Sequence, residues 1–105
     1  MTTRVVTLEA DGTTVDVAPG ERLELRLPEN AGTGYLWILD PPGPPVTVAE
    51  EALRPPAAAR AGAAGEHRFV LHAGEPGETT LVARHARPWA PESELGRFRL
   101  TVRVR

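Results

Sequence analysis

The stretch RFRLTVRVR, residues 97–105, alternates strictly between two kinds of side chain. Phe98, Leu100, Val102 and Val104 are apolar, and the positions between and beside them are arginine or threonine. Successive side chains of a β-strand point to opposite faces of the sheet, so a period of two predicts a strand with one buried face. We therefore expect residues 97–105 to form a strand with its apolar side in a core.

Similar short runs recur along the rest of the chain. RLELRL (22–27) alternates in the same way, and YLWIL (35–39) is apolar on both faces, as expected of a central strand in a sandwich. The other runs are RVVTLE (4–9), TTVDV (13–17), VTVAEEAL (46–53), HRFVLHA (67–73) and TTLVARH (79–85). Seven or eight strands at this spacing predict an all-β fold, an immunoglobulin-like antiparallel β-sandwich with Trp37 in its core.

The length of 105 residues fits a single domain, 1–105. DPPGPP (40–45) and RPPAAARAGAAG (54–65) resemble linkers in composition. We expect them to be long loops instead, because the pieces on either side are too small to fold alone. We also expect a monomer.

Several residue types that common enzymes need are missing. The chain has no cysteine and no lysine, and Ser93 is its one serine, with no histidine close to it in sequence. His67 and His72 are five residues apart and should point to opposite faces of one strand, and His85 lies on another, so no metal site is expected. The sequence therefore predicts a protein that is not an enzyme and binds no cofactor.

The overall charge also limits the partners and the location. A net charge of −2 favours neither nucleic acid nor an acidic membrane surface. The first residues, MTTRVVTLEADG, contain no apolar run typical of a signal peptide or a membrane span. As the sequence stands we expect the protein in the cytoplasm, or secreted or periplasmic if a leader has been removed.

Two connecting segments contain residues that are unusual for a strand, and a third, described below, is rich in small residues. In ENAGTGYLW (29–37), Asn30, Gly32 and Gly34 can take left-handed backbone angles. In RPW (87–89), Trp89 is held between prolines, which indicates a stiff loop rather than a strand interior. A tight connection between sheets would also explain the first segment, and a Trp folded back over the core would explain the second.

Together with RAGAAGEHRF (60–69), these segments would occupy the loops that gather at one end of such a sandwich. In this order they resemble the chagasin family of cysteine protease inhibitors, whose three loops carry Asn-Pro-Thr-Thr-Gly-Tyr/Phe, Gly-x-Gly-Gly and Arg-Pro-Trp. The matching residues are Asn30, Ala31, Gly32, Thr33, Gly34 and Tyr35, then Gly62, Ala63, Ala64 and Gly65, then Arg87, Pro88 and Trp89. Ala31, Gly32 and Ala64 depart from the family pattern.

The resemblance implies a reversible inhibitor that plugs the cleft of a papain-like cysteine protease without being cleaved. The loop around Thr33 would lie next to the catalytic thiolate, the 62–65 loop along the non-primed side, and Trp89 on the primed side. The alternative is a binding module of the same fold that inhibits nothing.

Overall fold

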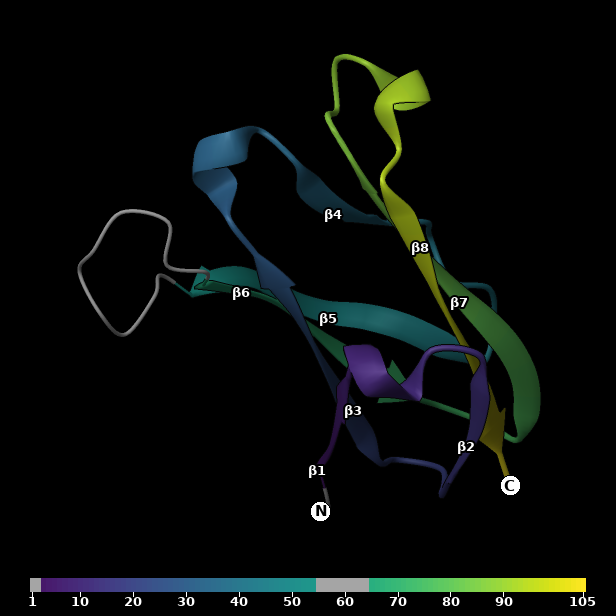
Figure 1. The fold of residues 1–105 in the computed structure, drawn as a ribbon. Helices are drawn as coiled ribbons and strands as arrows, with labels where there is room; N and C mark the ends of the chain where they lie inside the picture. Colours follow the sequence, from purple (N-terminus) through teal and green to yellow (C-terminus); the bar gives the residue numbers. More distant parts are fainter. Residues whose placement is uncertain (1–2, 55–64) are drawn as a thin grey trace.

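The structure is a computed structural model that describes residues 3–54 and 65–105. Within these ranges the chain forms eight strands and three short 3-10 turns (Figure 1). The strands are β1 (Thr3–Thr7), β2 (Thr13–Val17), β3 (Arg22–Glu29), β4 (Leu36–Leu39), β5 (Val46–Arg54), β6 (Gly65–Ala73), β7 (Gly77–Ala86) and β8 (Gly96–Val104). The turns are η1 (Leu8–Ala10), η2 (Ala31–Thr33) and η3 (Pro91–Ser93). Each predicted run overlaps one of these strands, which confirms the all-β prediction.

The strands form two four-stranded sheets packed face to face. One sheet has the order β1-β3-β6-β5 and the other β2-β8-β7-β4. Most pairs are antiparallel, but β1 runs parallel to β3 and β2 runs parallel to β8. A parallel pair cannot be joined by a tight hairpin, and here the path from β1 to β3 passes through η1 and β2 of the opposite sheet.

The predicted central position of YLWIL is wrong. β4 is the last strand of its sheet and pairs with β7 alone. Trp37 is buried, whereas Leu36, Ile38 and Leu39 are only half-buried. A run that is apolar on both faces can cover the rim of a core as well as cross its centre, so hydrophobicity alone did not distinguish the two positions.

The core lies between the inward faces of the two sheets. The arginines of β8 point outward, where Arg97 meets Glu94 and Arg103 meets Glu78 and Asp16. Trp37 is 5% exposed, as predicted for a core residue. The largest fully buried side chains are Phe69, Phe98, Leu23, Leu25, Leu27, Leu71, Leu81 and Leu100. No helix in the described parts of the chain is long and apolar enough to span a bilayer.

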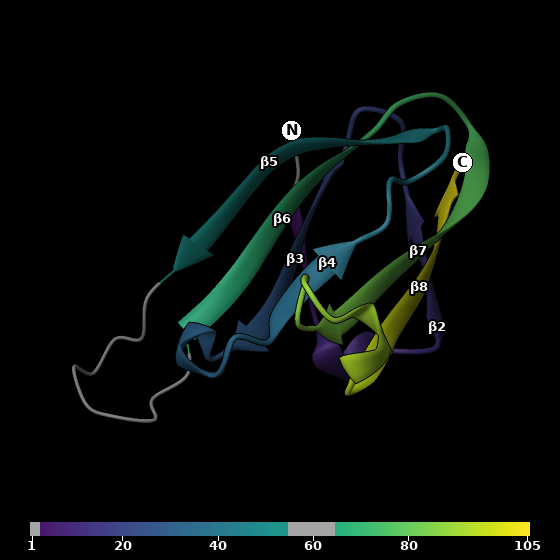
Figure 2. The same cartoon turned by 90° about the horizontal axis from the view of Figure 1, so that it is seen from above.

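The strand registers place the strand ends that flank three connections at the same end of the sandwich (Figure 2). Glu29 at the end of β3 pairs with Gly65 at the start of β6, and Arg54 at the end of β5 pairs with Glu66. In the other sheet the last residues of β7 lie beside the first residues of both β4 and β8. The β3–β4, β5–β6 and β7–β8 connections therefore start and finish at one end.

Candidate functional site

The first loop, residues 30–34, is organised by its own hydrogen bonds. The Thr33 N–H and hydroxyl both donate to the Asn30 carbonyl, at 3.1 and 2.8 Å. The Asn30 side-chain oxygen accepts the Gly32 N–H at 3.2 Å, and the Thr33 hydroxyl accepts the Tyr35 N–H at 3.2 Å. This turn places the exposed residues Gly32 and Thr33 at the tip of the loop.

One residue of this loop has the left-handed conformation that the sequence suggested for three. Gly34 has a φ of 82°, whereas Asn30 and Gly32 have ordinary negative φ values. Asn30 acts through its side chain instead, as the acceptor that closes the turn. The left-handed region is costly for residues with a Cβ, so Gly34 is the position where glycine is required.

The third loop, residues 87–95, presents Trp89 to solvent. The Ala90 N–H donates to the Arg87 carbonyl at 2.9 Å, which closes a tight turn with Pro88 and Trp89 at its centre. The Ser93 hydroxyl accepts the Arg87 N–H at 3.1 Å and donates to the Ala90 carbonyl at 2.6 Å. Trp89 is 72% exposed, as predicted.

The first and third loops contact each other. A Cβ built on Gly34 would lie 2.8 Å from Cη2 of Trp89, so the indole packs against the Gly34 backbone. The Arg87 guanidinium lies 4.5 Å from the centre of the Tyr35 ring, a cation–π contact. Gly34 and Tyr35 of the first loop therefore lie directly against Trp89 and Arg87 of the third loop.

The second loop is described only at its edges. Gly62, Ala63 and Ala64 lie outside the described residues. Gly65 begins β6 and pairs with Glu29, immediately before the first loop. The edge of the predicted 62–65 segment is thus beside the first loop.

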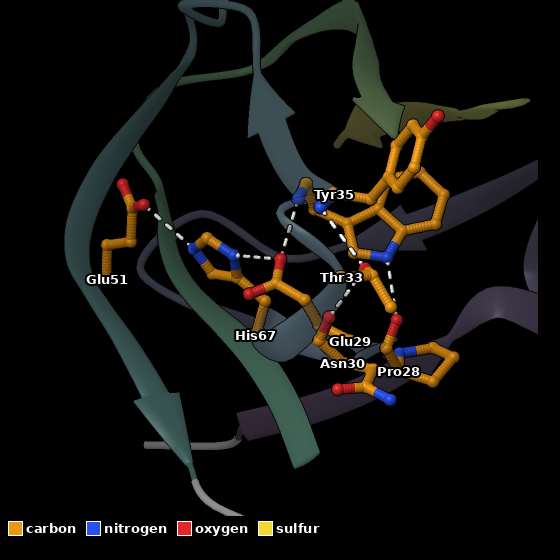
Figure 3. A network of polar contacts seen from close by, with 8 residues as sticks. Pro28, Glu29, Asn30, Thr33, Tyr35, Glu51 and His67 are labelled. Atoms are coloured by element: carbon orange, nitrogen blue, oxygen red, sulfur yellow. Dashed lines mark hydrogen bonds and ion pairs between the residues drawn. The ribbon is translucent and has the colours of Figure 1, made fainter. Parts of the chain in front are cut away.

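A buried carboxylate that we did not predict lies beneath the first loop. Glu29 is 5% exposed, and its Oε2 accepts the Trp37 N–H at 2.6 Å (Figure 3). The same oxygen lies 2.9 Å from Nδ1 of His67, and the indole N–H of Trp37 donates to the Pro28 carbonyl at 2.8 Å. The signal was present in the sequence, because Glu29 continues the inward-facing odd positions of β3 after its three leucines.

The three histidines have different surroundings. His67 is buried, stacks on Phe69 and also contacts Glu51 through Nε2 at 2.8 Å. His85 stacks on Trp37 with ring centres 4.5 Å apart, whereas His72 lies on the opposite face of β6 from His67, as predicted. Among the residues described, no three His, Cys, Asp or Glu side chains are arranged to hold a metal ion.

The sequence of this chain matches a known family of proteins. The family described as chagasin family peptidase inhibitor I42 matches residues 16–103. The chain is 30% identical over 99 residues to amoebiasin-1 of Entamoeba histolytica, covering 94% of this chain and 97% of that protein. It is also 30% identical over 99 residues to chagasin of Trypanosoma cruzi, covering 89% and 90% of the two chains.

Solved structures show the same fold. The cysteine protease inhibitor EhICP2 of Entamoeba histolytica superposes with a TM-score of 0.88 at 18% identity, covering 99% of this chain and 96% of that one. PbICP-C, solved in complex with falcipain-2, gives a TM-score of 0.73 at 22% identity, covering 98% and 89%. From its sequence matches, the chain belongs to the chagasin family of I42 peptidase inhibitors.

Proposed function

We propose that this protein is a reversible inhibitor of papain-like cysteine proteases that occludes the active-site cleft with the loops at one end of its sandwich. Membership of an inhibitor family, and not of an enzyme family, supports this function. The observation that carries the proposal is the contact between the first and third loops, which offers Thr33, Gly34 and exposed Trp89 on one surface.

In this proposal the tip of the first loop enters the cleft next to the catalytic thiolate. Gly32 and Gly34 leave no side chain in the way, so the backbone can approach the cleft walls closely. The 3-10 turn at 31–33 is folded back on Asn30 rather than extended. Peptide hydrolysis needs a near-attack arrangement of carbonyl and nucleophile, so a loop held in this turn blocks the cleft without reacting.

Trp89 supplies the second contact, on the primed side of the cleft. Tryptophan and arginine are the residues most enriched among those that dominate binding energy at interfaces. The tight turn around Pro88 and the hydrogen bonds of Ser93 restrict the loop before binding, so less entropy is lost on association. The 62–65 segment would line the non-primed side, consistent with the position of Gly65 beside Glu29.

The test is a titration of papain and of a cathepsin with the purified protein. We expect competitive inhibition with one inhibitor per protease, and no inhibition of a serine protease such as trypsin. Circular dichroism of the same preparation shows whether the protein is folded. A folded protein that leaves both cysteine proteases active at micromolar concentration would favour the alternative, a binding module without inhibitory activity.

A further inference from the structure

Glu29 is an unusual residue to find buried in a small domain. Its carboxylate is 5% exposed, and Oε1 has no hydrogen-bond partner among the described residues. Removing a carboxylate from water is costly unless its partners compensate, and a buried charge pair is a weak reason for stability by itself. The contacts of Glu29 therefore point to a role other than filling the core.

Those contacts close the first loop at its base. Glu29 ends β3 in one sheet, and Trp37 lies in β4 of the other sheet. The bond from the Trp37 N–H to Glu29 and the bond from the Trp37 indole to the Pro28 carbonyl join the two ends of the segment that carries residues 30–35. The loop thus leaves and enters the sandwich at a fixed separation.

His67 connects this base to the strand that leads into the second loop. Its Nδ1 faces Glu29 on β3 and its Nε2 faces Glu51 on β5, at 2.9 and 2.8 Å (Figure 3). The strand residues paired with His67 on either side, Leu27 and Leu53, are apolar. A carboxylate only accepts hydrogen bonds, so both contacts are hydrogen bonds when the ring carries both protons.

We propose that Glu29 and His67 are positioning residues for protease inhibition, which hold the first loop in its binding conformation and link it through Glu51 to β5. This inference rests on the proposed inhibitory function. Neither side chain reaches the exposed surface of the loops, so each acts through the loop and not by touching the protease.

The test compares Glu29 with Glu24, a second buried carboxylate on the same strand. Glu24 is 8% exposed but pairs with Arg26 and Arg68, away from the loops. Glu29→Ala and Glu24→Ala each remove a buried carboxylate and should both lower the melting temperature. Glu29→Gln keeps an acceptor of the same shape and serves if Glu29→Ala does not fold.

We expect Glu29→Ala to weaken inhibition of papain about tenfold or more, chiefly through faster dissociation, while folded Glu24→Ala stays within about twofold of the parent. The inhibition of papain by Glu29→Gln should be weakened by an amount between those of Glu29→Ala and Glu24→Ala. Equal weakening by the Glu29 and Glu24 variants, or unchanged inhibition by both Glu29 variants, would overturn the proposal for Glu29.

His67 is tested against His72, which lies on the opposite face of the same strand. His67→Gln removes the ring that contacts Glu29 and Glu51, whereas His72→Gln removes a ring outside this network. We expect folded His67→Gln to inhibit papain at least about fivefold more weakly, chiefly through faster dissociation, and His72→Gln to stay within about twofold of the parent. Equal inhibition by the two variants would overturn the role assigned to His67.

Hydrogen exchange in the free protein separates this inference from the proposed function. If the parent does not inhibit cysteine proteases, the function is wrong, but faster exchange at the amides of Tyr35 and Trp37 in Glu29→Ala would still show that Glu29 holds the first loop in its conformation. Unchanged exchange at both amides would reject that role whatever the inhibition assay shows.

Discussion

The indole of Trp89 rests on the backbone of Gly34, so closely that a Cβ at Gly34 would lie 2.8 Å from Cη2. Two loops that are far apart in sequence are thereby fixed relative to each other before any partner binds. The same contact explains why a tryptophan that is 72% exposed can still have a defined orientation. Preorganisation of this kind lowers the entropy lost on binding.

Gly34→Ala should weaken the inhibition of papain by more than the accompanying loss of folding stability can explain. The positive φ of Gly34 makes any Cβ unfavourable by about 1 kcal/mol, and the new methyl group must also displace the Trp89 ring. Gly20→Ala is the matched control, because Gly20 has a φ of 89° with no atom within 4 Å of the added Cβ. It lies beside Ala73 at the opposite end of the sandwich.

Both variants should lose similar stability in denaturant melts, and only Gly34→Ala should lose affinity for papain. If Gly20→Ala weakens inhibition as much as Gly34→Ala does, the packing of Trp89 on Gly34 is irrelevant to binding.

Trp89→Ala should reduce affinity while leaving the melting transition nearly in place. An exposed loop side chain contributes little to the core, whereas an aromatic anchor at an interface contributes about 2 kcal/mol or more, roughly a thirtyfold change in affinity. Inhibition constants and melts on the same samples measure both quantities. Unchanged inhibition, or unfolding of the variant, would mean that Trp89 has a different role.

Trp37→Ala should show the opposite behaviour. Emptying a buried tryptophan site costs about 3–5 kcal/mol, a large share of the stability of a small domain. The variant also loses the hydrogen bond to the Pro28 carbonyl and the stacking on His85. A melting temperature close to that of the parent would contradict the core position of Trp37.

Local sequence patterns were sufficient to predict the strands and to distinguish the buried Trp37 from the exposed Trp89. RFRLTVRVR and RLELRL became β8 and β3 with the expected faces inward, because one buried face fixes the register of a strand. Proline on both sides of Trp89 kept it out of a strand interior. These features depend on residues that are close together in the chain.

Features that depend on partners distant in sequence were missed. The edge position of β4 follows from which strands pair, and its composition does not reveal this. Glu29 and His67 meet because β3 and β6 are antiparallel in one particular register, and each alone is an ordinary polar residue in a strand. The role of the Ser93 hydroxyl in the third loop was also missed, although its partners Arg87 and Ala90 are close in sequence, because a single hydroxyl in a loop does not reveal which backbone groups it bonds.

The inhibitor should survive prolonged incubation with its target protease. The hydrogen bonds from Thr33 to Asn30 hold residues 30–33 in a turn, and a protease substrate must instead lie extended across the catalytic thiolate. Mass spectrometry after incubation with a stoichiometric amount of papain should show the intact mass. Rapid cleavage between Asn30 and Tyr35 would indicate that the loop binds as a substrate.

Ser93→Ala should loosen the third loop and weaken inhibition without affecting the core. The substitution removes the acceptor of the Arg87 N–H and the donor to the Ala90 carbonyl, two bonds that hold the turn carrying Trp89. A neutral hydrogen bond contributes about 1 kcal/mol net, so the loss corresponds to about a five- to thirtyfold weaker inhibition if the whole effect falls on the bound conformation. Thr13→Ala is the control, because its hydroxyl also donates to a carbonyl three residues earlier at 2.6 Å but lies on β2, outside the three loops. Inhibition constants for the two variants decide between the alternatives: we expect Thr13→Ala to match the parent and Ser93→Ala to dissociate faster. If the two variants inhibit equally well, Pro88 and the contact with Gly34 are enough to orient Trp89.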